Sequence, residues 1–126
     1  TFWKFNEGKI GKMQNLKTLL EQLEIPVAYN HFNQPTNPPF VVFRRYSQSN
    51  FGADNKVYEK IDNYYVELYT EFKDVELEKN LENILTQADI FFNVESEDYI
   101  DSEKMYQVIY AINYKEEKNN GKIKNK

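Results

Sequence analysis

The residues that could carry out acid–base chemistry are one histidine and a large set of carboxylates. His31 is the only histidine in the chain. A histidine acts as a catalytic base only when a second group orients it, and the residues next to His31 in the chain include no serine or cysteine. We therefore interpret His31 as a structural residue. A small hydrolase or nuclease that uses His31 with acidic residues is kept as an alternative.

The carboxylates are numerous, but their spacing follows no catalytic or metal-binding motif. A glycosidase needs two carboxylates that face each other across a cleft. The sequence alone does not show which carboxylates face each other in space. A calcium loop needs alternating Asp or Asn residues around a glycine, and residues 54–55 lack the remaining ligands. We interpret these groups as solvated charges and predict no catalytic and no metal-binding residue. The set comprises Glu67, Glu71, Asp74, Glu95, Glu97, Asp98, Asp101 and Glu103.

The composition argues against several further classes of site. The 126-residue chain has no cysteine, which excludes a disulfide, a thiolate metal ligand and a cysteine nucleophile. Its four glycines are too scattered for a phosphate-binding loop, and we predict no cofactor. The net charge of -4 argues against a chain that binds nucleic acid over its whole surface. No apolar run approaches the ~18 residues of a membrane span, so we expect no membrane contact.

Residues 62–72 form the longest stretch with a period of two, and we expect the rest of the chain to be organised around it. Alternation of this length, rich in aromatic and β-branched residues, predicts a strand with one buried face. The face expected to be buried comprises Tyr64, Val66, Leu68, Thr70 and Phe72. The other face carries Tyr65, Glu67, Tyr69 and Glu71. This second face is either a subunit interface or a surface covered by a helix, and the sequence leaves both open.

Two segments have helical periodicity. Leucines spaced i, i+3, i+4 and i+7 predict a helix over residues 13–23, and a similar stripe predicts one over residues 75–88 with Asp74 as its N-cap. Residues 47–55 are polar and rich in turn-prone types, which predicts a loop. Extended segments are expected at residues 27–32, 40–46, 56–61, 90–97 and 104–113.

The order of these elements predicts an α+β fold. We expect a mostly antiparallel sheet of about four to five strands packed against two helices. The last strand, over residues 104–113, is largely apolar on both faces, so we expect it to be interior or covered on both sides.

The domain organisation is expected to be a single α+β domain over residues 13–114. Residues 115–126 are rich in lysine and predict a flexible, solvated tail. Residues 1–12 have no clean period, and two interpretations stay open. Either they form an ordered N-terminal arm that docks Phe2, Trp3 and Phe5 onto a surface, or they are an expression or upstream leader and Met13 is the biological start.

The two arginines of the chain are adjacent, and on a strand their side chains point to opposite faces. We expect one to pair with Glu67 or Glu71 across the sheet and the other to project toward a partner. Phe51 is either tucked back or available to a partner. The candidate partner interface comprises Arg44, Arg45, Phe51, Tyr65, Glu67, Tyr69 and Glu71.

The succession of segments resembles small proteins from the structural-gene cluster of long-tailed phages and prophages of Gram-positive bacteria. The resemblance covers about residues 13–114 and is strongest at residues 26–29, 38–40, 54–58, 64–70 and 102–107. The resemblance is carried by five segments: the strand start PVAY, the strand entry PPF, the turn DNKVY, the strand YYVELYT and the segment SEKMYQ. These features are similar to those of the tail-completion proteins, the tail terminators that join tail to head.

This resemblance implies a structural virion protein without enzymatic activity. Such proteins form a ring, typically hexameric, on the head-proximal end of the tail tube, where the ring stops polymerisation and docks to the head. The implied partners are further copies of the chain, the tail tube protein and the head–tail connector protein, with DNA passing through the ring without specific binding. The implied location is the head–tail interface of the virion, and the host cytoplasm during assembly. Another neck, head-completion or minor capsid protein of the same phage module is the alternative.

Overall fold

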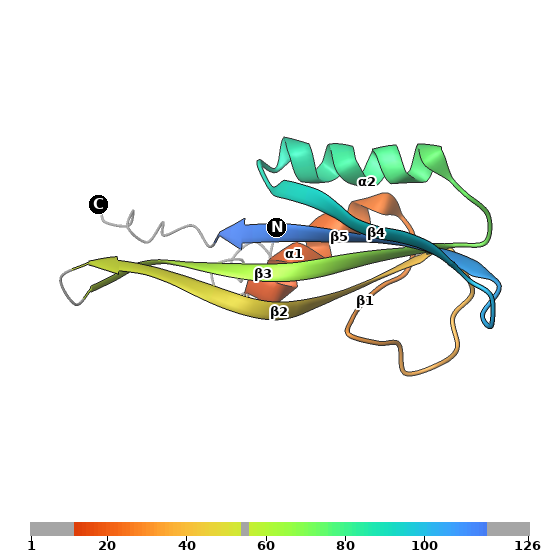
Figure 1. The fold of residues 1–126 in the computed structure, drawn as a ribbon, viewed down its shortest axis with the longest axis horizontal. Helices are drawn as coiled ribbons and strands as arrows, with labels where there is room; N and C mark the ends of the chain where they lie inside the picture. Colours follow the sequence, from red (N-terminus) through yellow and green to blue (C-terminus); the bar gives the residue numbers. More distant parts are fainter. Residues whose placement is uncertain (1–11, 54–55, 116–126) are drawn as a thin grey trace, which may run out of the picture.

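The structure is a computed structural model that describes residues 12–53 and 56–115, with side chains described for residues 15–48 and 61–114. Its five strands form one mixed, mostly antiparallel sheet in the order β1-β2-β3-β5-β4 (Figure 1), which confirms the predicted α+β class. The elements are α1 (Lys12–Leu20), the 3₁₀ helix η2 (Glu21–Leu23), β1 (Val27–Tyr29), β2 (Phe40–Ala53), β3 (Lys56–Thr70), α2 (Val75–Gln87), β4 (Phe91–Ile100) and β5 (Met105–Lys115). The remainder of the predicted N-terminal arm and residues 116–126 of the predicted tail lie outside the described residues.

The first helical segment ends as a tighter 3₁₀ turn. The sequence predicts one helix over residues 13–23, and the structure divides it into α1 and η2. Glu24 adopts a left-handed backbone conformation with φ of 63°, and its N–H donates a 2.9 Å hydrogen bond to the carbonyl of Glu21. This turn satisfies carbonyls at the helix end and directs the chain toward Pro26 and β1.

The hairpin of β2 and β3 is longer than predicted. The expected loop over residues 47–55 is wrong for its first seven residues, because β2 continues to Ala53 and β3 begins at Lys56. The polar side chains of this segment bond across the ladder: Asn63 Nδ2 donates to Ser47 Oγ at 2.8 Å. Among the described residues, the pairing of β5 with β3 ends at Ile61. Beyond this point the described hairpin arms pair with each other and project from the sheet (Figure 1).

The central strand ends two residues earlier than predicted. β3 ends at Thr70, so Glu71 and Phe72 lie in the turn before α2, and the Phe72 side chain is 64% exposed rather than buried. Asp74 is confirmed as the N-cap of α2, because its Oδ1 accepts a 3.0 Å hydrogen bond from the backbone N–H of Leu77. The turn is further held by Lys73, which contacts carboxylates on two different elements.

The last two strands complete the sheet. β4 extends to Ile100, three residues further than predicted, and carries a bulge between Val94 and Ser96. β5 lies between β3 and β4, which confirms the prediction that the strand with two apolar faces is interior.

Both helices pack on the same face of the sheet, where the core lies. Tyr110 in β5 is fully buried there, and its hydroxyl donates a 2.8 Å hydrogen bond to Oε2 of Glu82 on α2. Burial and the nearby Glu82 carboxylate raise the Tyr110 pKa well above its usual value, so the phenol stays neutral. The helices contribute Leu16, Leu20, Leu81 and Leu85 to this core, and the sheet contributes Val41, Phe43, Tyr64, Val66, Leu68, Val108, Tyr110 and Ile112.

Candidate interaction surface

The face of the sheet opposite the helices is the candidate functional surface, and we call it the open face. The register pairs Glu67 with Val42 and with Ile109, which places all three on this face. The alternative that a helix covers Tyr65, Glu67 and Tyr69 is wrong for the described helices, since both lie on the other side. The open face comprises Phe40, Val42, Arg44, Tyr46, Tyr65, Glu67, Tyr69, Gln107, Ile109 and Ala111.

A buried carboxylate organises the polar groups of this surface. Glu67 is only 8% exposed, and its Oε2 lies 3.3 Å from Nε of Arg44. Its Oε1 accepts a 2.8 Å hydrogen bond from the Tyr69 hydroxyl, which itself accepts one of 2.7 Å from Nε2 of Gln107. A carboxylate removed from water is tolerated only when charged or hydrogen-bonding groups surround it. Glu67 therefore ties β2, β3 and β5 together across the open face.

Aromatic rings extend this polar group in both directions. The Tyr69 ring stacks on Phe40 with centroids 4.8 Å apart, and Phe40 meets Phe32, from the loop after β1, edge to face at 5.3 Å. On the other side, Cζ of Arg44 lies 4.9 Å from the ring centroid of Tyr65.

The far end of this surface is a stacked pair of tyrosines. The Tyr65 ring stacks on Tyr46 with centroids 4.1 Å apart, and Tyr46 is the residue at the bulge in β2. A bulge re-aims a side chain relative to a regular strand, and here it brings Tyr46 onto the Tyr65 ring. We call the continuous group Phe32, Phe40, Tyr69, Glu67, Arg44, Tyr65 and Tyr46 the aromatic strip.

Two phenols of the strip, those of Tyr69 and Tyr46, have raised pKa values and stay neutral at physiological pH. Burial raises the pKa of Tyr69 to about 12; the hydrogen bond from Gln107 lowers it in part, while Glu67 raises it. Burial, followed by the nearby Tyr65 and Glu95, also raises the pKa of Tyr46. A neutral Tyr69 can donate to Glu67 and accept from Gln107 at once, so the network needs no ionisation change near neutral pH.

The second arginine makes a pair that sequence reasoning missed. The predicted pairing of an arginine with Glu67 is confirmed for Arg44. Arg45, expected to project toward a partner, instead lies with NH1 3.6 Å from Oδ1 of Asp62, which is 1% exposed. Gln48 Nε2 donates a 2.6 Å hydrogen bond to the same carboxylate oxygen. The signal was present in the sequence, because Asp62 shares the buried register of Tyr64 and a buried carboxylate needs a partner.

Glu71 and His31 lie apart from the strip, and the side chain of Phe51 is not described. Glu71 was expected on the same face as Tyr65, but β3 ends before it and Glu71 is exposed in the following turn. Phe51 belongs to β2, and its side chain is outside the described part of the chain. His31 is exposed just after β1, and its backbone N–H donates a 2.7 Å hydrogen bond to the carbonyl of Tyr29. The strip therefore unites Arg44, Tyr65, Glu67 and Tyr69 of the predicted set.

Other kinds of site are not evident within the described ranges. There, no three His, Asp or Glu side chains are grouped closely enough to hold a metal ion. No described helix has the length and apolar character needed to cross a membrane. Neither a protein-family model nor a curated protein matches this chain.

Proposed function

We propose that this chain is a non-enzymatic structural protein of the phage virion, a tail-completion protein. In this proposal, copies form a ring on the head-proximal end of the tail tube, stop its polymerisation and join the tail to the head connector. The basis is the resemblance over residues 13–114, taken together with the surface that the fold leaves for partners. The aromatic strip is the observation that carries the proposal.

The composition of the strip is that of a protein contact surface. Tyrosine, phenylalanine and arginine are enriched at interfaces. The aromatic side chains supply large contact area with little loss of side-chain freedom, and the arginine guanidinium donates several hydrogen bonds and stacks on aromatic rings. In the strip these groups are already held in place by Glu67, by ring stacking and by Gln107. A contact made by preorganised side chains loses little conformational entropy when a partner binds.

The shape of the sheet supports assembly through a repeating, head-to-tail contact. The hairpin of β2 and β3 projects beyond the end of β5 (Figure 1). A ring requires two different surfaces that meet around an axis. The open face and the projecting hairpin are two such surfaces at different places on the subunit.

The remaining partners follow from the position proposed for the ring. One rim of the ring contacts the tail tube protein and the other contacts the connector, while DNA passes through the lumen. The net charge of -4 favours passage over tight DNA binding, because like charges repel.

The solution mass of the purified full chain tests this proposal. Light scattering behind a sizing column, over a range of protein concentrations, should give one discrete closed species of about six subunits. An unlimited series of sizes contradicts a closing ring. If the protein is a monomer at all concentrations, a sample with assembled tail tubes is the decisive second measurement, and failure to cap those tubes overturns the proposal.

A further inference from the structure

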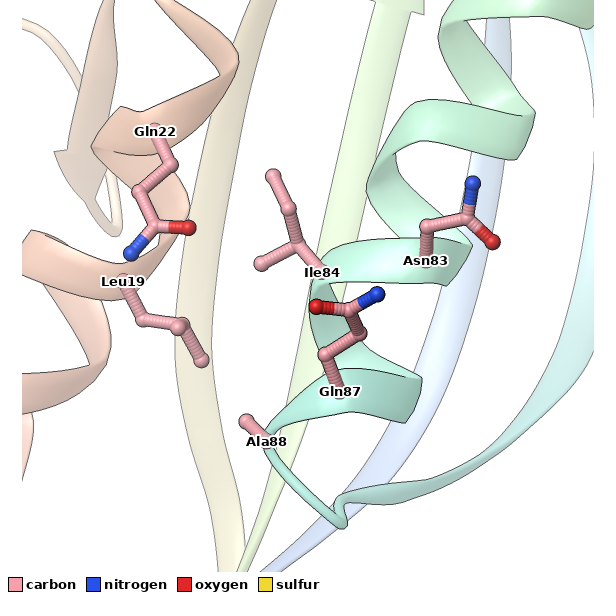
Figure 2. Close-up of a pocket in the computed structure, with 6 residues that line it drawn as sticks. All are labelled: Leu19, Gln22, Asn83, Ile84, Gln87 and Ala88. Atoms are coloured by element: carbon pink, nitrogen blue, oxygen red, sulfur yellow. The ribbon is translucent and has the colours of Figure 1, made fainter.

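Two further surface features lie outside the aromatic strip: a groove between the helices and the outer edge of β4. The groove has a volume of about 400 Å³ and lies between α1 with η2 on one side and α2 on the other (Figure 2). Its lining side chains are apolar groups and amides without charge, so the groove selects no particular partner. The edge of β4, by contrast, has a backbone pattern and a charge that together define what it can bind.

The two edges of the sheet differ in length and in how they are closed. β1 forms one edge with three residues, and just beyond them the Tyr29 hydroxyl accepts a 3.3 Å hydrogen bond from the backbone N–H of Arg45 in β2. β4 forms the other edge over ten residues, and among the described residues only β5 pairs with it. An edge strand directs alternate backbone N–H and C=O groups away from the sheet, where they can pair with a further strand. The β4 edge is therefore long enough to accept an extended segment of a partner.

The charges of β4 are all negative. Glu95, Glu97 and Asp98 are exposed, and the strand contains no lysine or arginine. Two β4 strands from different copies would bring these carboxylates face to face, which destabilises strand pairing. Nucleic acid, a chain of phosphates, is repelled in the same way. The charge of this edge therefore favours a segment with basic side chains over a second β4 strand.

The apolar side chains of β4 show where the other side chains of such a segment would lie. Val94 and Tyr99 are exposed, and the register pairs them with β5 residues on the helix side of the sheet. Asp98 is paired with Gln107 and so lies on the open face. Alternate side chains of an extended segment point to opposite faces. A segment in which apolar and basic residues alternate would thus cover Val94 and Tyr99 on one face and meet Asp98 on the other.

We propose that the outer edge of β4 binds an extended segment of a partner protein in which basic and apolar residues alternate. The segment adds to the sheet as a further strand, and its backbone pairs with that of β4. Its apolar side chains bury the exposed part of Val94 and Tyr99, and its basic side chains neutralise Glu95 and Asp98. This contact is separate from the aromatic strip, so it does not require the ring of the proposed function.

A short peptide of alternating lysine and valine, blocked at both ends and labelled with fluorescein, is the probe. Fluorescence anisotropy with the full chain should show saturable binding. Two control peptides should bind about tenfold more weakly: one has glutamate in place of lysine and loses the attraction to β4, and the other has proline in place of the central valine and loses a backbone donor. Hydrogen exchange with the lysine–valine peptide bound should show new protection in residues 91–100 and none in residues 27–29.

Charge variants of the chain separate the edge from the net charge. Glu95→Lys combined with Asp98→Lys should weaken binding of the lysine–valine peptide by about tenfold, because like charges then oppose each other across the strands. Glu97 is left unchanged, since its carboxylate lies 2.6 Å from Nζ of Lys73. The matched control combines Glu24→Lys with Glu76→Lys, two exposed positions outside the sheet. It changes the net charge equally and should leave peptide binding unchanged.

The outcomes distinguish this inference from the proposed function. Absence of binding, equal binding of the three peptides, protection elsewhere than in residues 91–100, or parental binding by the β4 charge variant overturns the inference. If the chain forms a discrete ring in light scattering and does not bind the peptide, only this inference fails. If the peptide binds along β4 and the chain neither assembles nor caps tail tubes, the proposed function fails and this inference stands.

Discussion

The hydroxyl of Tyr69 donates a 2.8 Å hydrogen bond to Oε1 of Glu67, two residues earlier on the same face of β3. The other oxygen of that carboxylate faces Arg44, so one buried charge holds a phenol from one side and a guanidinium from the other. Two rings flank this group. Phe40 stacks on the ring of Tyr69, and the ring of Tyr65 lies under the guanidinium of Arg44. Removal of the Glu67 charge should therefore disturb the whole aromatic strip.

Glu67→Gln tests how much this carboxylate stabilises the fold. The amide keeps the volume and can accept from Tyr69, but it loses the charge opposite Arg44. Because the Arg44 side chain is partly exposed, we expect a loss of about 1 kcal/mol in the free energy of unfolding. Urea unfolding at neutral pH measures it. The control Glu71→Gln, at the exposed position after β3, should change stability by less than about 0.5 kcal/mol; equal effects at both positions would show that Glu67 has no special role.

A charge placed on the aromatic strip should block self-association if the strip is the contact surface. Tyr65→Glu and Tyr46→Glu each put a charged carboxylate where a partner must exclude water, which is costly at an interface. Light scattering should show loss of the assembled species with the fold retained. Tyr99→Glu is a matched control, because Tyr99 is 46% exposed and Tyr46 is 43% exposed, but Tyr99 lies on β4 outside the strip. Normal assembly of both strip variants would rule out this face as the contact.

His31 separates the structural proposal from the hydrolase alternative. Its side chain is exposed after β1. The variant His31→Ala should therefore change the free energy of unfolding by less than about 0.5 kcal/mol. It should also leave the assembled mass unchanged within the error of the light-scattering measurement. A hydrolytic activity in the parent protein that disappears in His31→Ala would contradict the proposed non-enzymatic role.

The N-cap of α2 should contribute measurably to stability. Asp74→Ala removes the side chain that accepts from the N–H of Leu77, and loss of an N-cap typically costs ~1 kcal/mol. Asp74→Ser keeps a cap oxygen and should recover most of that loss. Urea unfolding of the three proteins gives the comparison, and an Asp74→Ser variant as unstable as Asp74→Ala would mean that the cap bond is not the cause.

The fold should lose stability at high pH through its buried tyrosines. Burial raises the pKa of Tyr64 and Tyr69 to about 12 each, and it raises the pKa of Tyr110 as well. An unfolded tyrosine releases its proton near pH 10, so between about pH 10 and 12 the unfolded chain releases protons that the folded chain retains. The stabilisation is therefore complete below pH 10 and decreases as the pH rises above it.

Ultraviolet titration of tyrosinate measures this difference. In the folded protein a fraction of the 10 tyrosines should titrate later than the rest, whereas in concentrated denaturant all should titrate together near pH 10. Tyr110→Phe should reduce the late fraction and the steepness of the stability loss. A single transition in the folded protein at the pH of the denatured chain would contradict the buried environment of these phenols.

Local patterns in the chain were enough to predict the fold class and its central elements. The alternation from Tyr64 to Thr70 predicts β3, the leucine stripe predicts α2, and Asp74 is placed correctly as its N-cap. These features depend on neighbours within one turn or one strand, and so they can be read without knowledge of the partners in space.

The errors come from residues whose conformation depends on distant partners. Residues 47–53 have the composition of a loop, yet they extend β2 because β3 offers a complementary ladder and side chains such as Asn63 to bond with. Conversely, Glu71 and Phe72 continue the alternation in sequence but have no strand partner, so β3 ends at Thr70.

The aromatic strip likewise depends on register. The sequence indicated that an arginine would pair with Glu67, but it could not place Tyr46 on Tyr65, Phe40 on Tyr69 or Gln107 beside Tyr69. A shift of one residue in strand pairing moves every side chain to the other face. Only the tertiary structure, which selects one register from the packing of both helices on the opposite face, decided which side chains form the strip.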